Sequence, residues 1–214
     1  MSEFPSKNKC VHTVVIDNWR PDVCAITLPN LERYAKRIGA DFNLISKSKF
    51  DGYPPNYERL QVWEAGKDYL WNICLDADTI LHRDFEDPTT WVNPASCGSL
   101  WMTDAKFYFA WNRYFERDAR NIGVADCFVV SSWLTHDLWQ PLDLTFEEAK
   151  KLCFKDERMV SEYCLSLNVA KFGLKFNGVV QDHSKHFSPM VTTHKVKDAA
   201  EVFRSKLAEW GEPI

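Results

Sequence analysis

The sequence predicts an α/β fold in which a mainly parallel central sheet lies between two layers of helices. In the first 80 residues, β-branched apolar runs alternate with segments of helical periodicity, and this order implies parallel strands with helices on the faces of the sheet. A chain of 214 residues that is 45% hydrophobic also buries one substantial core. We therefore expect a single domain over residues 1–214, and the abrupt end in GEPI leaves open that further polypeptide follows.

The first half of the chain has a regular strand and helix pattern. The β-branched run 10–17 ends in polar residues, which is typical of a buried strand followed by a loop. Leu28, Leu31 and Ile38 then recur at helical spacing, and Gly39 is a typical C-terminal stop. The expected elements are a strand over 10–17, a helix over 28–39, a strand over 40–46, a Pro- and Gly-rich loop over 49–56, a helix over 57–66 and a strand over 69–78.

The second half is less regular and richer in aromatic residues. No Ser- and Gly-rich linker and no internal repeat divides it from the first half. We expect an aromatic segment over 104–118, a strand over 123–132, helices over 145–154 and 157–173, a strand and loop over 174–184, and an amphipathic helix over 195–210.

The composition makes several classes of protein improbable. The 26 basic residues balance 30 acidic ones without a dense Lys and Arg cluster, so we expect neither nucleic acid nor an anionic membrane as partner. Seven scattered cysteines, odd in number and without a CxxC pair, indicate neither a disulfide framework nor a zinc knuckle. The sequence also lacks an apolar leader and any run of about 18 apolar residues. We therefore expect a soluble protein of the reducing cytoplasm.

Two aspartates follow the third expected strand, in the stretch NICLDADTILHRDFEDP. Ligands bind at the carboxyl edge of a parallel sheet, and side chains two residues apart share a face while the strand persists. Asp76 and Asp78 could therefore address one cation. Paired hard oxygen ligands suit Mg²⁺ or Mn²⁺, which complete their shells with water and substrate phosphates. The alternative is that the two aspartates only cap a turn.

The stretch YERLQVWEAGKDYLWNICLDADTILHRDFEDP resembles the donor-site segment of glycosyltransferases of the GT-A fold. The likeness is greatest to the glycogenin and bacterial galactosyltransferase group, whose pattern is an aromatic residue, any residue, Arg-Leu, a spacer and Leu-Asp-x-Asp. The whole chain is also similar to short glycosyltransferase domains encoded by large algal DNA viruses. The resemblance implies a GT-A three-layer domain and a hexosyltransferase that moves a sugar from a UDP-sugar to a glycan or glycoprotein hydroxyl. It also implies Mn²⁺ or Mg²⁺ as cofactor, favours retention of configuration and, for a viral protein, places it in the host cytoplasm.

The resemblance also assigns residues around the donor. Asp78 matches the direct metal ligand, and Asp76 matches the carboxylate that binds both the metal and the donor ribose or sugar. Arg59 matches the arginine that contacts the donor sugar or diphosphate, and its alternative is a solvated helix charge. The segment TVVIDNW resembles the first-strand stretch around the nucleobase, although core packing explains Val15 equally well. The nucleotide-site candidates there are Thr13, Val15, Asp17 and Trp19.

Further candidates lie near the C-terminus. His194 matches the family's additional metal ligand, with His183 and His186 as competitors. Lys195 and Lys197 could neutralise the departing diphosphate or form the solvated start of the last helix.

A third group of candidates concerns the chemistry at the sugar. Glu162 stands nearest the family's acidic position, although the amide of the family pattern is missing here. Asp156 and Glu157 are alternatives, because helix N-termini favour acidic residues for ordinary dipole reasons. Asp126 is a candidate for contact with a sugar hydroxyl.

Two other classes of function compete with this one. The run ICLDADTIL also resembles the signature of haloacid dehalogenase-type phosphatases, with Asp76 as nucleophile and Asp78 as general acid. The downstream Mg²⁺ motif of that family is missing, and two expected strands precede the run. A non-catalytic carbohydrate-binding domain is the third class, since Trp101, Trp111 or Tyr108 could stack on a sugar face. The donor sugar, the acceptor and the oligomeric state stay open.

Overall fold

The computed structural model describes residues 4–99, 102–118, 122–124, 127–178, 190–192 and 197–214. The strands are β1 (Lys7–Val14), β2 (Asp41–Ile45), β3 (Tyr69–Leu75), β4 (Thr79–Leu81), β5 (Ser96–Ser99), β6 (Met102–Asp104), β7 (Ile122–Val124), β8 (Phe128–Ser132), β9 (Lys175–Gly178) and β10 (Met190–Thr192). The α-helices are α1 (Pro21–Arg37), α2 (Val62–Ala65), α3 (Ala105–Tyr108), α4 (Arg113–Asp118), α5 (Phe146–Ala149), α6 (Val160–Lys171) and α8 (Ala199–Trp210). The 3₁₀ helices are η1 (Pro55–Gln61), η2 (Pro88–Thr90), η3 (Trp133–Trp139), η4 (Lys150–Leu152) and η5 (Glu157–Met159).

The central sheet has six strands in the order β2-β1-β3-β8-β5-β9. β1 pairs in parallel with both β2 and β3, so the carboxyl ends of these three strands meet at one edge. β8 runs antiparallel to β3 and to β5, while β9 is parallel to β5. The prediction of a mainly parallel sheet is confirmed, with β8 as the exception. Two small sheets, β10-β4 and β6-β7, complete the described strands.

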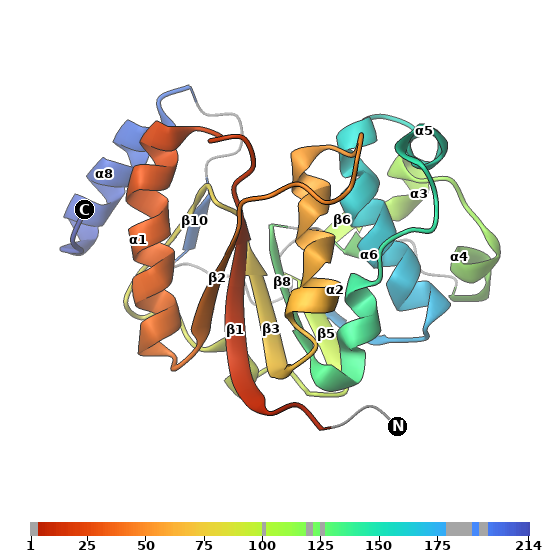
Figure 1. Cartoon of the computed structure of the whole chain (residues 1–214), viewed down its shortest axis with the longest axis horizontal. Coiled ribbons are helices and arrows are strands. Elements are labelled where there is room, and N and C mark those ends of the chain that lie inside the picture. The colour runs from red at the N-terminus through yellow and green to blue at the C-terminus, as the bar shows by residue number, and fades with distance from the viewer. Residues whose placement is uncertain (1–3, 100–101, 119–121, 125–126, 179–189, 193–196) are drawn as a thin grey trace.

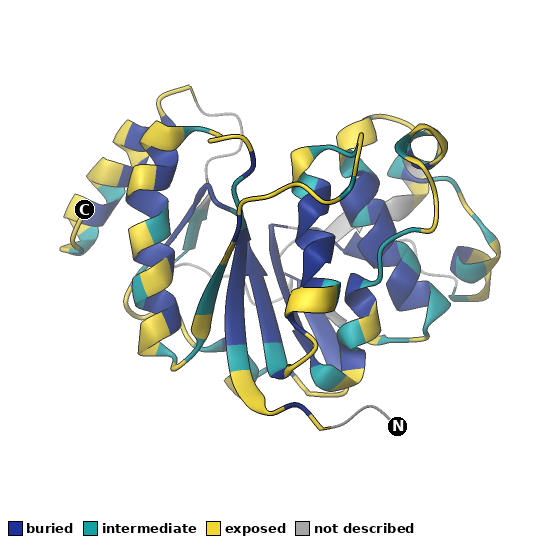
Figure 2. Cartoon of the chain, in the orientation of Figure 1, coloured by how far each residue is buried: buried dark blue, intermediate teal, exposed yellow. Residues whose placement is uncertain are grey.

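Helices cover both faces of this sheet, as the three-layer prediction requires (Figure 1). α1 and α8 lie on one side, and η1, α2 and α6 lie on the other. Apolar side chains of α1 meet those of β1, β3 and β8 in one core cluster, and a larger cluster joins η1, η3 and α6. Figure 2 shows the strands buried between helices whose outer faces are exposed. The apolar face of α1 is therefore buried against the sheet, as its amphipathic pattern predicts.

The last helix is fastened to the strand that follows the two aspartates. Phe203 and Leu207 of α8 pack against Ile80 of β4 and against the first turns of α1. Just after β4, Arg83 donates hydrogen bonds to the carbonyl oxygens of Trp210, at 3.0 Å, and Gly211, at 3.3 Å. The carbonyls at the end of α8 are therefore satisfied by a side chain. None of the described helices is long and apolar enough to cross a membrane.

Several element boundaries differ from the sequence prediction. The first strand spans residues 7–14 rather than 10–17, because its polar start forms the exposed end of β1. α1 begins at Pro21, seven residues before the expected start, and continues through Pro29. Proline is favoured in the first turn, and Pro29 lies on the exposed side of the helix, where water can satisfy the carbonyl that lost its partner.

The expected helix over 57–66 is also different. It forms a 3₁₀ segment, η1, that starts at Pro55 and continues into the single turn of α2. The expected helix over 157–173 likewise begins with a 3₁₀ turn, η5, before α6. Side-chain bonds to neighbouring loops hold the tighter geometry of η1, which local periodicity does not report.

Candidate functional site

Asp76 and Asp78 lie where β3 ends, at the edge shared by the carboxyl ends of β1, β2 and β3. Their side chains are mostly withdrawn from solvent, with 14% of the Asp76 side chain and 6% of the Asp78 residue exposed. The backbone amide of Asp76 donates to the carbonyl of Cys127, at 3.1 Å, just before β8. The antiparallel β8 thus helps to fix the first aspartate.

Asp76 forms an ion pair with Arg59 from η1. One guanidinium nitrogen lies 2.9 Å from Oδ1 of Asp76, and only 4% of the Arg59 side chain is exposed. Nε of Arg59 donates to the carbonyl of Asn56, also at 2.9 Å, which fixes the plane of the guanidinium. Removing either charge would leave the other buried without its partner, which is strongly unfavourable. The sequence-predicted residues Arg59 and Asp76 are therefore brought together, although they are 17 positions apart.

The turn that carries the aspartates is also attached to α1. The hydroxyl of Thr27 donates to the carbonyl of Ala77, at 2.6 Å. Asn30 binds the backbone of Leu81 in both directions, since its amide nitrogen donates to the carbonyl and its amide oxygen accepts from the N–H. All of these side chains are buried. The aspartates therefore sit on a segment held from α1, η1 and β8, which is the rigid support that a precise binding site needs.

Asp78 faces the first turns of α1. Burial raises the pKa of the Cys24 thiol there, and the negative charges of Asp22 and Asp78 raise it further, while Arg20 opposes them. The thiolate is disfavoured mainly because it is buried, and the neighbouring carboxylates add a smaller effect. A region of this kind suits a bound cation better than a second anion.

The loop between β1 and α1 has an unusual backbone. Asp17, Asn18 and Arg20 have φ angles of 53°, 52° and 41°, in the left-handed region that L-residues rarely adopt. Trp19 lies between them and is 39% exposed, and the Arg20 guanidinium lies 5.9 Å from its ring centroid. Strained residues of this kind concentrate at functional sites. Asp17 and Trp19, both nucleotide-site candidates, are thus exposed at the carboxyl edge.

The other two nucleotide-site candidates are less accessible. Val15 is half-buried, and Thr13 is fully buried on the same side of β1 as the core residue Val11. Among the described residues, the Thr13 hydroxyl has no hydrogen-bond partner. Its role therefore remains a prediction, and the structure places it in the core rather than on the surface.

The candidate base Glu162 lies in the second half of the chain, in the first turn of α6, and is half-buried. Burial is the main reason that the pKa of Cys153 is raised to about 12, and the charges of Glu162 and Asp156 add to it. These two carboxylates therefore lie near the same thiol. Asp156 caps η5 by accepting a hydrogen bond from the backbone N–H of Arg158, and it forms an ion pair with the Arg158 side chain. These contacts give Asp156 a structural role as a helix cap.

Several remaining candidates cannot be placed. Asp126, His194 and Lys195 lie outside the described residues, as do His183, His186 and Trp101.

The other candidates lie on the surface of the described structure. Lys197 is exposed in the turn before α8. Glu157 is exposed at the start of η5, and Trp111, 39% exposed, stacks on Phe115 with a 5.1 Å centroid distance. Their functional roles remain predictions.

Glu58 is a residue that the sequence did not single out. It lies in the same YERL segment as Arg59 and is fully buried, with its carboxylate bound by four donors. From the sequence alone, a charged residue beside Arg59 is expected to be an ordinary exposed charge on a helix. Its burial becomes visible only when the loop that packs on it is known. Thr27 and Asn30 were missed for the same reason, since their partners are about 50 positions away.

The residues present fit a divalent cation in part. Asp76 and Asp78 supply carboxylate oxygens, the donors that Mg²⁺ and Mn²⁺ prefer, and they lie in a region of negative charge at a sheet edge. Within the described ranges, no group of three or more His, Cys, Asp or Glu side chains is placed to hold a metal. Two protein ligands with waters and substrate phosphates are enough for such a cation, and the predicted third ligand, His194, lies outside those ranges.

One open hollow among the described residues lies away from the aspartates. An open depression of about 400 Å³ lies where α1 turns into β2, at the opposite end of the sheet from the aspartates. It is lined by Glu32, Ala35, Lys36, Gly39, Ala40, Asp41 and Phe42. This depression is a poor candidate for an active site despite its size, because its lining lacks buried polar groups that converge on one point.

Comparisons with known proteins give a result for structure only. No protein-family model matches the chain, and no curated protein matches it. Among solved structures, it is similar to a glycosyltransferase involved in glycosylation of the major capsid of PBCV-1, with 10% identity over 92% of this chain and 99% of that chain, at a TM-score of 0.55.

Two further solved structures are less similar. An active-site mutant of LgtC is 14% identical over 94% of this chain and 95% of that chain, at a TM-score of 0.49. Drosophila β-1,4-galactosyltransferase 7, in complex with manganese, UDP-Gal and xylobiose, is 10% identical over 92% and 79%, at 0.45. At these identities the likeness is one of fold. Taken with the sheet order, the first structure confirms the GT-A fold that the sequence predicted.

Proposed function

We propose that this protein is a metal-dependent glycosyltransferase that moves a sugar from a UDP-sugar to a hydroxyl of a glycan or glycoprotein, with retention of configuration. The observation that carries the proposal is the buried Arg59–Asp76 pair beside Asp78, held rigidly at the carboxyl edge of the sheet. In this fold that edge is where a ligand can meet groups from several strands. A protein of known structure that shares the fold is a glycosyltransferase.

In this proposal the carboxyl edge binds the donor. Asp76 and Asp78, with His194 as third ligand, would hold Mn²⁺ or Mg²⁺, and the bound cation would supply Lewis-acid chemistry toward the diphosphate. Arg59 holds Asp76 in one orientation and is assigned to the donor sugar or diphosphate. The exposed turn of Asp17 and Trp19 lies beside the nucleoside, with Val15 and Thr13 behind it.

The remaining residues act on the leaving group and the acceptor. Lys195 and Lys197 stabilise the negative charge that grows on the diphosphate as the glycosidic bond breaks. The acceptor hydroxyl attacks the anomeric carbon and loses its proton either to Glu162 or to the leaving phosphate on the same face. Glu162 as base would give inversion, and proton transfer to the phosphate gives retention. Asp126 is assigned to a hydroxyl of the donor sugar.

The test is calorimetric titration of UDP into the metal-free protein, with and without Mn²⁺. We expect binding that appears only with Mn²⁺, because the diphosphate meets two carboxylates unless a cation lies between them. In the presence of Mn²⁺, screening of UDP-sugars for hydrolysis then identifies the donor. Binding of UDP with equal affinity with and without the metal would contradict the proposed role of the two aspartates.

The competing functions give different results. A haloacid dehalogenase-type phosphatase would hydrolyse p-nitrophenyl phosphate with Mg²⁺ and would lose this activity in Asp76→Asn. No observation favours it, since the aspartates follow the third strand along the chain and the sheet has the GT-A arrangement. A pure carbohydrate-binding domain would bind glycans unchanged in Asp78→Ala and would not bind UDP. In a transferase, His194→Ala weakens UDP binding less than Asp78→Ala.

A further inference from the structure

Glu58 is the most completely buried acidic side chain near the candidate site. The residue is 0% exposed, and both carboxylate oxygens are occupied by donors. Oε1 accepts from the hydroxyl of Ser48 and from the backbone N–H of Phe50, while Oε2 accepts from the N–H of Lys49, at 2.9 Å, and the amide of Gln61, at 2.7 Å. No ion pair to Glu58 exists among the described residues.

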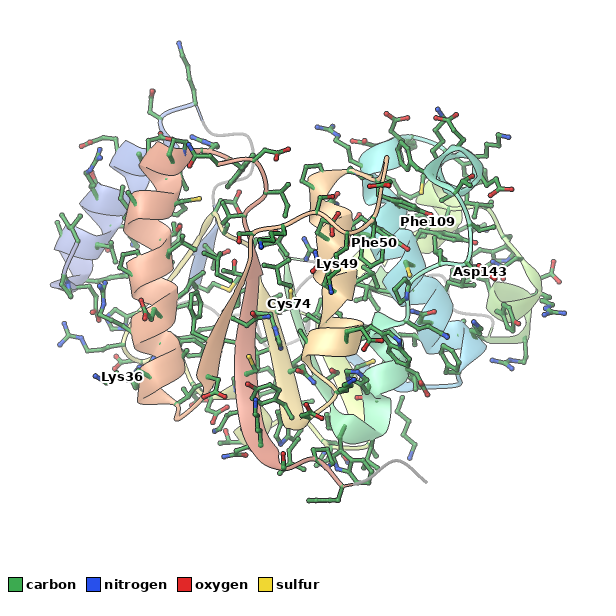
Figure 3. The ribbon with its side chains drawn as sticks, in the orientation of Figure 1. Lys36, Lys49, Phe50, Cys74, Phe109 and Asp143 are labelled. Atoms are coloured by element: carbon green, nitrogen blue, oxygen red, sulfur yellow. The ribbon has the colours of Figure 1, made fainter. Side chains whose placement is uncertain are left out.

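Three of these donors, Ser48, Lys49 and Phe50, come from the loop that follows β2, at the same edge of the sheet as the aspartates, while Gln61 belongs to η1 itself. Lys49 and Phe50 lie beside the helix that carries Glu58 in Figure 3. The amide of Gln61 also donates to the carbonyl of Lys47, at 2.7 Å, so a second residue of the helix binds the same loop. Farther along, the ring of Tyr53 stacks on Tyr57 with a 4.0 Å centroid distance. The loop over 47–53 and η1 are therefore joined at several points into one body.

Glu58 and Arg59 are consecutive residues of η1 and point in different directions. In a 3₁₀ helix successive side chains are rotated by about 120°, so one residue binds the loop while the next reaches Asp76. A short 3₁₀ helix has weak internal geometry and depends on side-chain contacts for its orientation. The three bonds from the loop to Glu58 fix the rotation of η1, and this rotation sets where the Arg59 guanidinium meets Asp76.

We propose that Glu58 is a positioning residue, which locks the loop over 47–50 onto η1 and thereby holds Arg59 against Asp76. It acts through Arg59 and touches no substrate. This inference rests on the proposed function only for its effect on donor binding. Its structural part concerns the free protein and stands independently.

The experiment uses Glu58→Gln in the full chain. Glutamine keeps the shape of the side chain but replaces one carboxylate oxygen by an NH₂ group, which is a donor. This NH₂ group would face either the N–H of Lys49 and the amide of Gln61 or the hydroxyl of Ser48 and the N–H of Phe50, all of which are donors themselves. Glu64→Gln is the matched control, because Glu64 is nearby on α2, makes the same charge change and has a side chain that is 61% exposed. Hydrogen exchange of the Lys49 and Phe50 amides and the Nε–H resonance of Arg59 are measured by NMR without ligand. UDP affinity with Mn²⁺ is measured by calorimetry.

We expect exchange of both amides to become about tenfold faster or more, and the Arg59 resonance to shift, in Glu58→Gln but not in Glu64→Gln. UDP binding weakens about tenfold, and Glu58→Gln adds nothing further in an Arg59→Lys background, because both changes act through one guanidinium. A purely structural role predicts additive effects on UDP binding instead. Faster exchange with an unmoved Arg59 resonance overturns the proposal.

The other outcomes are equally decisive. If the wild-type protein does not bind UDP with Mn²⁺, the proposed function fails, while the exchange and Arg59 measurements still decide whether Glu58 positions Arg59. Unchanged UDP affinity in Glu58→Gln, with normal binding in the wild type, overturns its link to the donor. If Glu58→Gln does not fold, Ser48→Ala is used instead, because it removes one of the four donors to Glu58. A shift of the Arg59 resonance in Ser48→Ala supports the proposal, and an unchanged resonance contradicts it.

Discussion

The central sheet carries two buried polar clusters that differ in charge and in surroundings. The His12 cluster joins β1, β2 and β3: Nε2 of His12 donates to Oδ1 of Asn72, at 2.9 Å, and Nδ1 accepts from the amide of Asn43, at 3.0 Å. Asn72 in turn donates to the carbonyl of Gly66. The edge cluster holds full charges in Glu58, Arg59, Asp76 and Asp78.

The difference indicates that the two clusters serve different ends. The His12 cluster is neutral and satisfies its members internally, so it costs little and specifies how the strands meet. Burying the charges of the edge cluster is expensive, and a hydrophobic replacement would often be more stable. Such charges are retained where they act on a ligand. Changes in the His12 cluster should therefore alter stability, and changes in the edge cluster should mainly alter binding, although those that break the Arg59–Asp76 pair should also lower stability.

Replacing a carboxylate of the edge cluster tests binding most directly. We expect Asp78→Asn to weaken Mn²⁺-dependent UDP binding by about 100-fold or more, since an amide is a neutral and poorer ligand for a hard cation. The free energy of unfolding should change by less than about 1 kcal/mol, because the substitution removes a buried charge. Calorimetry and urea denaturation measure the two effects. Asp84→Asn, whose side chain is 76% exposed and lies just beyond β4, is the control. A large loss of stability with intact UDP binding would reverse the assignment of the two clusters.

Crowding the His12 cluster should have the opposite result. A Cβ on Gly66 would lie 2.3 Å from Oδ1 of Asn72 and 2.7 Å from the carbonyl of Val62, and both distances are too short. We expect Gly66→Ala to lower the free energy of unfolding by about 3 kcal/mol, as overpacking and a lost hydrogen bond combine. UDP affinity of the folded fraction should stay within about twofold. Thermal and urea denaturation test this, with Ala65→Ser at the exposed neighbour as control.

The His12 cluster should also make stability depend on pH. Burial lowers the pKa of His12 from 6.5 to about 4, opposed by its bond to Asn72. Between these values the unfolded chain binds a proton that the folded protein does not, so stability falls as the pH drops from 6.5 toward 4. The total loss should be on the order of 3 kcal/mol. Urea denaturation across this range measures it, and His12→Gln should remove that part of the slope. An identical slope in His12→Gln would contradict the prediction.

The smallest expected effect concerns the strained turn after β1. Asp17→Gly should stabilise the protein by at most about 1 kcal/mol, because glycine adopts the positive φ without strain but loses more entropy on folding. Asp17→Ala keeps the strain and removes the carboxylate, so it should not stabilise. Denaturation of the two variants separates backbone from side chain. If alanine stabilises as much as glycine, the positive φ carries no strain here.

The sequence predicted the parallel half of the fold and one pair of the site. An apolar strand that ends in LDAD is a local signal, and Arg59 belongs to the same short motif. Their contact follows once β3 and η1 are adjacent. The direction of β8 was not predictable, because its apolar run is the same whether the strand is parallel or antiparallel. The role of Glu58 depends on a loop eight to ten residues away that packs against it. The periodicity of the sequence does not predict contacts between a loop and a helix.

The second half of the chain shows why the rest was harder. Apart from α8, its described helices are short or begin with 3₁₀ turns, and capping side chains such as Thr145 and Asp156 set some of their ends. Patterns of 3.6 residues need more than one or two turns to be distinguished from loops. Glu162 could be placed on a helix from sequence alone, but not its neighbours in space, Cys153 and Asp156.

The attachment of α8 to Arg83 affects how the chain must be made. The bond from Arg83 to Trp210 joins positions 127 residues apart, and contacts of such separation form late because long loops must close first. Until α8 has been synthesised, Val23, Ile26 and Ile80 lack the helix that covers them. A growing chain that stops before Ala199 therefore presents an apolar surface next to the aspartates, a natural target for chaperones during translation. The segment that directly follows the metal-site candidates is thus among the last to become protected.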